Sequence, residues 1–397
     1  MPKLENTDRQ RTYLPSLEGI RGYAFLPVFF AHYFPVSLFP YHSSLWMFPM
    51  SLVMDTAWLA VPIFFVLSGY LIGGILYDTR NRVGYFRVFY SRRILRVFPV
   101  YYITLLVVAA IDFAHGVPLN YNYWSHFLYI QNLLPGYTGH LNEAPSAQTI
   151  HFWSLAVEEQ FYLTWPLVVW LCRDRRTLLR VTVLLIGFCC LVRLLSPWMH
   201  LSVTRCYFLT PTRVDAILLG VVLALVREDN IYKRLQPFAK YVALAGISSM
   251  IVVAIWTGHT TPRTHLRIAL QIPCVNLTAA AMIVAVLERG SLLCRICSGR
   301  WICWFGSISY GLYIFHFTYA DWFLKSFEPR LAAYMPRPWA FIASAAVAFC
   351  LTLALAVLSY RFVEQPAMNL KRRLKYGPVR NQKPLDATES SLANCEV

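Results

Sequence analysis

The chain has 397 residues, of which 57% are hydrophobic and only 14% are charged, and its mean hydropathy is +0.47. Soluble globular domains carry about 25% charged residues, so this composition excludes an ordinary soluble protein and favours a polytopic membrane protein. The formal net charge of +16 does not indicate nucleic-acid binding, because the basic residues lie in short segments between apolar runs.

Ten apolar runs are long enough to cross a bilayer, which takes about 17 to 25 residues of helix. These runs fall near residues 14–35, 52–77, 97–114, 152–171, 178–196, 210–226, 238–256, 268–287, 303–324 and 339–362. The sequence therefore predicts an all-α polytopic membrane protein with about ten transmembrane helices. We expect a polar N-terminal segment at 1–13, a transmembrane domain at 14–365, and a basic, disordered cytoplasmic tail at 366–397.

Lysine and arginine are distributed unequally between alternate connections, and this bias sets the orientation of a membrane protein. The connection after the second run, 78–96, is rich in arginine, whereas 36–51 and 115–151 on the other side contain neither lysine nor arginine. This distribution predicts that both termini lie in the cytoplasm, which requires an even number of spans. The expected location is the cytoplasmic (inner) membrane of a bacterium.

The first run, 14–35, carries groups that are costly in a bilayer. Arg21 and His32 are eleven residues apart, which at ~100° per residue places both on one helical face, about 16 Å apart along the axis. Together with the nearby Glu18, this shared face is the first candidate for a functional site. The alternative is that Arg21 extends toward the lipid headgroups and His32 is a hydrogen-bonded core residue.

The fourth run, 152–171, carries two adjacent carboxylates, Glu158 and Glu159. At least one of them must be paired or protonated inside a bilayer, and such groups are typical of proton relays and substrate sites. In the predicted orientation they lie at a depth similar to that of His32. We therefore expect one of them to pair with His32 and raise the basicity of its imidazole. The alternative is a structural ion pair of Glu158 with Arg21 or Arg213.

Other runs hold polar side chains that we regard as supporting candidates. They are Ser68, Ser154, Arg213, Asp215, Ser309, Tyr310 and His316. A lone histidine such as His316 is more often a core residue than a catalyst. Arg361 and Glu364 have i,i+3 spacing, which favours an ion pair at the end of the tenth run. No metal site is expected, because Cys294 and Cys297 have no second pair at a suitable distance.

Arg92, Arg93 and Arg96 cluster immediately before the third run, in the segment SRRILRVFP. Guanidinium groups bind phosphate through paired hydrogen bonds, so this cluster suits a phosphate-rich cytoplasmic ligand. Lipid headgroups are the alternative partner. On the opposite side, the connection 115–151 is rich in tyrosine and tryptophan. These rings either stack on a sugar or belong to an interfacial belt with a re-entrant segment near 124–134.

Taken together, these stretches closely resemble the membrane acyltransferase-3 family. The family's signature is an arginine and a histidine separated by ten residues in the first span, after Leu-Asp/Glu-Gly-x-Arg. The chain has LEGIR…AH, with Glu18 at the acidic position. The resemblance continues in order through FFVLSGYLI, SRRILRVFP, HFWSLAVEEQFYL, RVDAILLG, FGSISYGLYIFH and RFVEQP. It covers nearly the whole chain, and the set of motifs is specific although no single motif is.

The resemblance implies transfer of an acyl group, often acetyl from acetyl-CoA, to a hydroxyl of a sugar or another acceptor. His32 matches the family's catalytic histidine, Arg21 its essential arginine, and Arg92, Arg93 and Arg96 a conserved basic motif. Some members carry a fused extracytoplasmic SGNH-hydrolase-like domain. Because only a short tail follows the last run, we expect the stand-alone form. Acyl-CoA is then a donor substrate, and no bound cofactor is expected.

The residues and the resemblance lead to one expected mechanism. Acyl-CoA binds from the cytoplasm with its phosphates near the arginines, and His32, supported by Glu158 or Glu159, removes the proton of an acceptor hydroxyl that arrives from outside. The expected acceptor is a glycan, and a small lipophilic acceptor such as a macrolide is the alternative. A proton-coupled transporter would use the same residues as a relay, but the two halves show no matching repeats. An acyl-enzyme on one of the candidate serines and the oligomeric state stay open.

Overall fold

The computed structural model describes residues 14–33, 57–114, 116, 121–134, 149–172, 174–257 and 263–379. Within these ranges the structure is helical, apart from turns and one isolated antiparallel bridge between Arg82 and Val379. This confirms the all-α prediction for the part of the chain that is described. The expected N-terminal segment, 1–13, lies outside the described residues.

Nine longer helices form the body of the part of the chain that the structure describes. They are α1 (Pro15–Tyr33), α3 (Ala60–Thr79), α4 (Tyr85–Ala114), α6 (Phe152–Leu171), α7 (Arg175–Leu195), α9 (Asp215–Val226), α11 (Ala239–Thr257), α12 (His265–Leu287) and α18 (Arg337–Ser359). Shorter helices connect them: α5 (Tyr121–Phe127), α8 (Val203–Phe208), α10 (Asn230–Leu235), α13 (Leu292–Cys297), α14 (Arg300–Ser307), α15 (Ser309–Phe315), α16 (Ala320–Trp322), α17 (Glu328–Ala332) and α19 (Gln365–Lys371). Short 3₁₀ turns include η2 (Ala57–Leu59), η3 (Gln131–Leu133), η4 (Thr210–Thr212) and η5 (Gln236–Phe238), and π turns are η6 (Phe323–Phe327) and η7 (Tyr360–Glu364).

Six helical segments of the described chain are long and apolar enough to cross a membrane. They are Ala57–Thr79, Tyr85–Ala114, Arg175–Leu195, Asn230–Thr257, His265–Leu287 and Arg337–Lys371. The chain is therefore an integral membrane protein, whereas the number of ten spans stays a prediction. Two predicted spans are not continuous helices. The sixth run is divided into η4 and the 12-residue α9, and the ninth is interrupted between α14 and α15 at Ile308.

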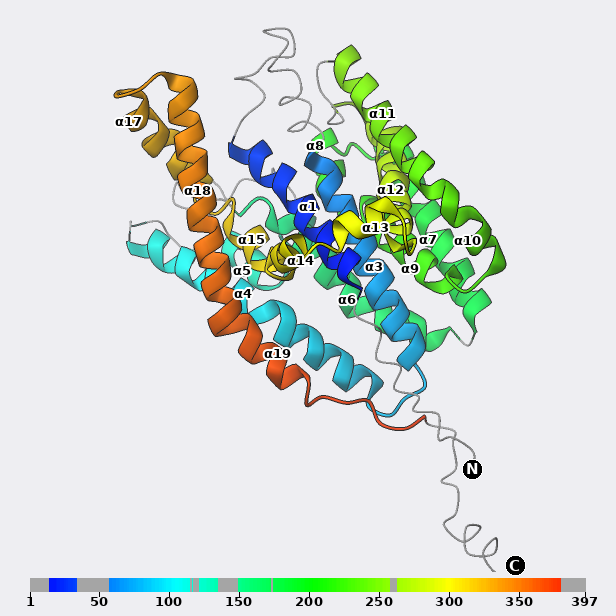
Figure 1. Ribbon diagram of the computed structural model, residues 1–397. Helices are drawn as coiled ribbons and strands as arrows, with labels where there is room; N and C mark the ends of the chain where they lie inside the picture. Colours follow the sequence, from blue (N-terminus) through cyan, green and yellow to red (C-terminus); the bar gives the residue numbers. More distant parts are fainter. Residues whose placement is uncertain are drawn as a thin grey trace, which may run out of the picture.

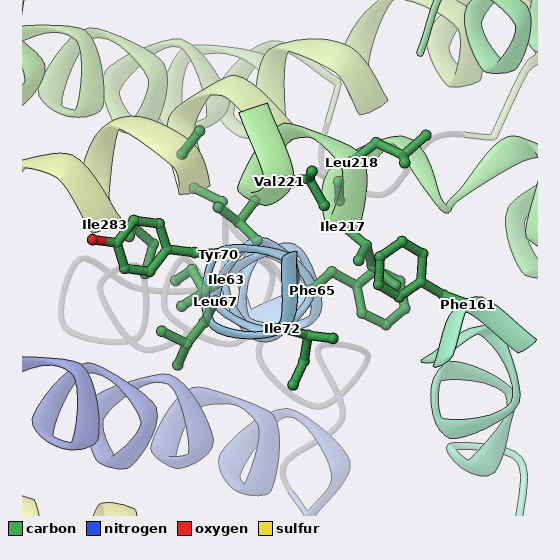
Figure 2. Close-up of a cluster of buried hydrophobic side chains, with 14 of the residues drawn as sticks. Ile63, Phe65, Leu67, Tyr70, Ile72, Phe161, Ile217, Leu218, Val221 and Ile283 are labelled. Atoms are coloured by element: carbon green, nitrogen blue, oxygen red, sulfur yellow. The ribbon is translucent and has the colours of Figure 1, made fainter. Parts of the chain in front are cut away.

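α3 lies in the larger hydrophobic core and packs against α6, α9 and α12 (Figure 2). Its core side chains include Ile63, Phe65, Leu67, Tyr70 and Ile72. The backbones of α3 and α9 touch, because a Cβ added to Gly69 would lie 1.8 Å from the carbonyl oxygen of Ile217. Small residues at a crossing let membrane helices approach this closely.

α1 is fixed against α13 and α14 in the same way. A Cβ added to Gly19 would lie 1.7 Å from the carbonyl oxygen of Cys297, and one added to Gly306 would lie 1.8 Å from that of Glu18. Arg21 and His32 are rotated about 200° and 220° from Gly19 around a regular helix. Both functional candidates on α1 therefore face away from this contact.

α19 and η7 run beside α4 (Figure 1). α4 begins at Tyr85 rather than at the predicted residue 97, so the arginine-rich segment lies on its first turns. The prediction of a disordered tail is wrong for 366–379. There, α19 is followed by a segment in which the amide of Gly377 donates to the carbonyl of Val83 at 3.0 Å. Residues 380–397 lie outside the described residues.

The connection 115–151 is described at 116, 121–134 and 149–151, where it packs against α4 and α6. The ring of Tyr129 stacks on Tyr101 at 4.3 Å between centroids, and the side-chain amide of Gln131 donates to the carbonyl of Phe152 at 3.1 Å. The described part of this connection is therefore packed against the helices, and its two alternative interpretations stay predictions. Trp124 is 69% exposed and so remains open to stacking on a ligand.

Candidate active site

Three histidines from different helices meet at the C-terminal end of α1. Nδ1 of His32, in the last turn of α1, lies 3.0 Å from Nε2 of His316, which follows α15. The ring of His151, which precedes α6, lies 5.0 Å from the ring of His316. His151 and His316 are buried, and His32 is partly exposed. These three residues are called the histidine cluster below.

Backbone carbonyls fix which nitrogens of this cluster carry protons. Nδ1 of His316 lies 2.7 Å from the carbonyl oxygen of Tyr313, which can only accept, so we assign the proton to this nitrogen. Nε2 of neutral His316 is then an acceptor, and Nδ1 of His32 is the donor of the 3.0 Å contact. This assignment leaves the lone pair of His32 on Nε2, which is the form that a general base needs.

His151 carries a second lone pair into the cluster. Its Nε2 lies 3.1 Å from the carbonyl oxygen of Ile314 and is therefore the protonated nitrogen. Its Nδ1 is buried and, among the described residues, has no hydrogen-bond partner. A buried acceptor of this kind suits a hydroxyl or another donor from a bound molecule.

The predicted pairing of His32 with a carboxylate is wrong, because the ring partner of His32 is His316. Glu158 and Glu159 lie about two helical turns beyond His151 on α6, or roughly 10 to 12 Å along the axis. His151 is thus the titratable group of α6 that reaches the cluster. The carboxylates lie deeper in the bundle than the sequence argument assumed.

Hydroxyl groups lie along α6 between the histidine cluster and these carboxylates. The hydroxyl oxygens of Ser154 and Tyr313 are 2.6 Å apart, and Tyr313 also donates to the carbonyl of His151 at 3.0 Å. Further along, the hydroxyl of Ser68 on α3 lies 2.5 Å from that of Tyr162 and bonds with Glu158. The structure therefore places Ser154 at the histidine cluster and Ser68 at the carboxylates.

Charged side chains gather nearer the N-terminal end of α1. Nη1 of Arg21 lies 3.6 Å from a carboxylate oxygen of Glu18, and Nη1 of Arg96 lies 3.8 Å from one of Glu364. Arg21 also interacts electrostatically with Arg96, Glu364 and Glu158. These five residues and Arg93 are called the charged cluster. The alternative ion pair between Arg21 and Glu158 is not formed, since the carboxylate within 4 Å of Arg21 belongs to Glu18.

The expected ion pair between Arg361 and Glu364 is also wrong. Glu364 is buried and pairs with Arg96 of α4, whereas Arg361 is exposed and lies over the ring of Phe362. The i,i+3 rule assumes α-helical geometry, but residues 360–364 form the π turn η7, in which hydrogen bonds skip five residues.

The three arginines of the basic motif have different surroundings. Arg93 lies over the ring of Tyr162 at 5.5 Å and interacts electrostatically with Glu158 and Glu159. Its Nε is buried and has no hydrogen-bond partner among the described residues. Arg93 and Arg96 therefore face the interior.

Arg92 points elsewhere. Its Nε donates to the carbonyl of Leu374 at 3.0 Å, and its guanidinium lies 5.0 Å from the ring centroid of Tyr376. Both partners belong to the segment after α19, so Arg92 holds this segment against α4. The structure thus separates Arg92 from the two arginines with which it was grouped.

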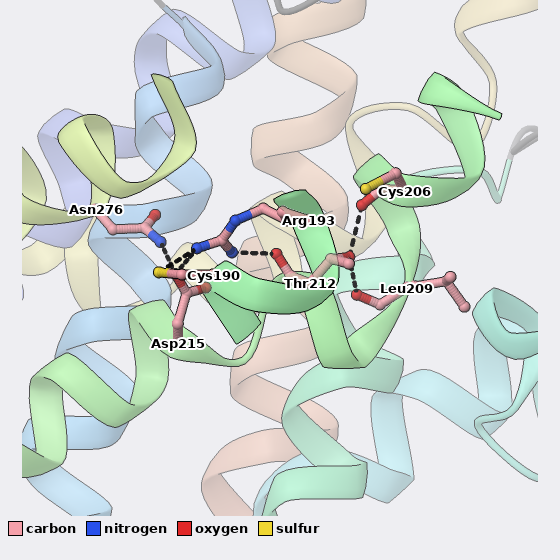
Figure 3. A network of polar contacts seen from close by, with 7 residues as sticks. All are labelled: Cys190, Arg193, Cys206, Leu209, Thr212, Asp215 and Asn276. Carbon is pink, nitrogen blue, oxygen red and sulfur yellow. Dashed lines mark hydrogen bonds and ion pairs between the residues drawn. The ribbon is translucent and has the colours of Figure 1, made fainter. Parts of the chain in front are cut away.

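Asp215 belongs to neither cluster and instead joins three helices (Figure 3). It accepts hydrogen bonds from Arg193 of α7 at 2.7 Å and from Asn276 of α12 at 3.0 Å. Arg193 also donates to the carbonyl of Thr212 at 2.6 Å. Breaking such a buried pair leaves an uncompensated charge, so Asp215 is a structural residue of α7, α9 and α12.

Arg213 is buried between two aromatic rings, at 5.3 Å from Trp153 and 4.7 Å from Tyr207. Its alternative ion pair with Glu158 is not formed in the described chain, where the guanidinium nitrogens of Arg213 have no hydrogen-bond partner. Of the candidates in the ninth run, Ser309 is buried and the hydroxyl of Tyr310 donates to the carbonyl of Val97 at 2.7 Å. Tyr310 therefore helps to seat α15, which precedes His316, whereas the buried hydroxyl of Ser309 has no hydrogen-bond partner among the described residues.

Sequence reasoning missed two residues of the site and undervalued a third. His151 and Tyr313 were not candidates, and His316 was interpreted as a core residue. The available signals were the position of His151 directly before the run that holds the paired glutamates, and the i,i+3 spacing of Tyr313 and His316. Neither signal reveals that the breaks beside α15 and α6 bring the three rings together.

The fold and the two clusters define an integral membrane protein with a polar interior, in which titratable groups at depth mark a substrate or proton path. The family model described as "Acyltransferase domain" (acyltransferase 3) matches residues 14–361. The chain belongs to this family of acyltransferases, as its motifs predicted.

Similarity to known proteins covers most of this chain but only about half of each relative. "Peptidoglycan O-acetyltransferase OatA" of Listeria monocytogenes serovar 1/2a is 28% identical over 389 residues, covering 91% of this chain and 56% of the relative. "Putative peptidoglycan O-acetyltransferase YrhL" of Bacillus subtilis (strain 168) is 29% identical over 380 residues, with coverages of 89% and 55%. "Putative O-acetyltransferase SACOL0978" of Staphylococcus aureus (strain COL) is 27% identical, with coverages of 90% and 58%. The chain spans about half the length of these relatives. No solved structure matches it.

Proposed function

We propose that the chain is a membrane O-acyltransferase that moves an acyl group from cytoplasmic acyl-CoA to a hydroxyl of a glycan. The expected acyl group is acetyl. The relatives are named as O-acetyltransferases, which supports acetyl as the group transferred. In this proposal both termini lie in the cytoplasm of a bacterium and the acceptor arrives from the outer side, in agreement with the lysine and arginine bias.

The observation that carries the proposal is the 3.0 Å contact between Nδ1 of His32 and Nε2 of His316. Through this contact the carbonyl of Tyr313 selects the tautomer of both rings and leaves the lone pair of His32 on Nε2. The contact does for His32 what a carboxylate does in other acid–base sites, because it orients the ring and assists charge development on it.

The donor path in this proposal runs along one face of α1. The phosphates of acyl-CoA bind near Arg93 and Arg96, and Arg21 lies farther inside, next to Glu18. From Arg21 the pantetheine arm crosses about 16 Å of helix to place its thioester beside His32. Guanidinium groups bind phosphate through paired hydrogen bonds, so Arg21, Arg93 and Arg96 suit the anionic end of the donor.

The transfer step requires one proton transfer and one acyl transfer. Nε2 of His32 takes the proton of the acceptor hydroxyl while the oxygen attacks the thioester carbonyl. A carbon–oxygen bond forms, the carbon–sulfur bond breaks, and the CoA thiolate leaves with the proton returned by His32. Nδ1 of His151 accepts a second hydrogen bond from the acceptor and so orients it. In this proposal the acyl group passes directly from the thioester to the acceptor.

Purified protein in phosphatidylcholine nanodiscs tests this proposal. It is given acetyl-CoA and either soluble peptidoglycan fragments, the substrate named for two relatives, or a macrolide. We expect CoA thiol release together with an acetyl ester on the glycan, detected by mass spectrometry. Ester formation on the macrolide alone would show that the acceptor is a small lipophilic molecule and not a glycan. A protein that releases no thiol with either acceptor, but drives proton-coupled uptake in liposomes, would overturn the proposal.

A further inference from the structure

Lys371, the last residue of α19, is a half-buried cation surrounded by other cations. Arg93, Arg96 and Arg92 of α4 all lie close enough to repel it electrostatically. Among the residues that the structure describes, no carboxylate lies within 4 Å of its ammonium group, and the nearby Glu364 already pairs with Arg96. The contact between α4 and α19 therefore holds more positive than negative charge.

Converging like charges at a partly buried position are unfavourable unless an anion binds between them. We propose that Lys371 binds the phosphate groups of the acyl donor together with Arg93 and Arg96, in a site formed between α4 and α19. The inference rests on the proposed function, because it takes acyl-CoA as the donor. It adds to the basic motif a cation from the other end of the chain, and it removes Arg92 from the ligands.

The segment after α19 keeps Lys371 in place. The carbonyl of Leu374 accepts from Nε of Arg92, and Gly377 and Pro378 exchange backbone hydrogen bonds of 3.0 and 3.1 Å with Val83, in the turn between α3 and α4. Arg92 is thus a positioning residue, since it holds the segment that presents Lys371. Figure 1 shows α19 beside the first turns of α4.

An anionic lipid headgroup presents the same phosphate chemistry as the donor. The donor is favoured because the site continues directly into the charged cluster. Arg96 interacts with Arg21, and Arg93 interacts with Glu158, so the path from Lys371 leads along α1 toward His32. A lipid site at the membrane surface would not need this internal connection.

The test compares Lys371→Met with Lys375→Met, which removes the same charge from an exposed position in the same segment. Both variants are measured in phosphatidylcholine nanodiscs with acetyl-CoA and with S-acetyl-pantetheine, which has no phosphate. We expect Lys371→Met to raise KM for acetyl-CoA about tenfold, as for one charge-assisted hydrogen bond, and to leave KM for S-acetyl-pantetheine unchanged. Lys371→Arg should restore most of the affinity, and Lys375→Met should resemble the wild type.

Calorimetric binding of free coenzyme A gives a readout that does not depend on turnover. A tenfold weaker Kd in Lys371→Met supports the phosphate site even if transfer to the offered acceptors fails. Equal weakening for coenzyme A and pantetheine would show a structural role and overturn the inference. So would unchanged affinity in phosphatidylcholine combined with a defect only in nanodiscs that contain anionic lipid, because that result assigns Lys371 to the lipid.

Discussion

The histidine cluster and the charged cluster lie on the same helix, but they handle charge in opposite ways. Around His32 the partners are neutral rings and backbone carbonyls, with hydrogen bonds that select one tautomer. Around Arg21 the partners are ions, and the charged cluster holds three guanidinium groups and three carboxylates. Under the proposed function, this difference lets one end of α1 move a proton while the other end holds an anion.

The largest expected effect comes from removing the base. His32→Ala should lower the rate of transfer by about 10² to 10⁴, because general-base help is worth that much. Thiol release by the purified variant measures the loss. The matched control is His200→Asn, at an exposed histidine with φ of 52°, where asparagine is tolerated. A fully active His32→Ala protein would show that His32 is not the general base.

The next test rotates His32 away from the helical face that it shares with Arg21. One alanine inserted between Val28 and Phe29 rotates His32 by ~100° relative to Arg21 and removes its contact with His316, while every side chain is kept. We expect transfer to fall at least about a hundredfold. The insertion variant must first be shown to express and fold like the wild type. Near-normal activity in such a protein would mean that the two clusters do not serve one reaction.

The tautomer assignment predicts a smaller, graded effect at His316. His316→Ala should lower kcat about tenfold to a hundredfold, because Nδ1 of His32 loses its acceptor and the ring is free to adopt the wrong tautomer. His316→Gln keeps an acceptor oxygen and should retain more activity than the alanine variant. If both variants lose activity equally, together with thermal stability, His316 is a packing residue and the relay is wrong.

The charged end should respond in affinity rather than in rate. Arg93→Ala and Arg96→Ala should each raise KM for acetyl-CoA about tenfold with little change in kcat, since each contributes a charge-assisted hydrogen bond to the phosphates. Arg92→Ala should raise it less, because Arg92 contacts Leu374 and Tyr376. Equal effects for all three would restore the original grouping of the basic motif.

The smallest expected effect is the one that tests topology. Leu128→Cys places a thiol at an exposed position of 115–151 and should leave activity within about twofold of the wild type. An impermeant maleimide should label this thiol in intact cells, before lysis. Asn132 is unsuitable for this purpose, because it is buried and donates to the carbonyl of Phe208. Labelling only after lysis would reverse the proposed orientation.

The sequence predicted what depends on composition and helical period. It gave the all-α membrane class, and it grouped Arg21 with His32 on one face of α1, opposite the glycine contact. It failed where tertiary contacts decide the partner. His316 takes the place expected for a glutamate, and Arg96 takes the carboxylate expected for Arg361. Both errors came from comparing depth or spacing along single helices, which says nothing about breaks such as the one at Ile308 or the π turn η7.

The contact of α1 with α13 and α14 has a consequence for motion. Backbone touches backbone there at Gly19 and Gly306, so we expect the three helices to move as one rigid body. α19 and the segment after it contact α4 through long side chains such as those of Arg92 and Arg96, whose contacts can rearrange when an anion binds. Spin labels on α1 and α14 should therefore keep one distance when coenzyme A is added, whereas labels on α4 and α19 should change theirs.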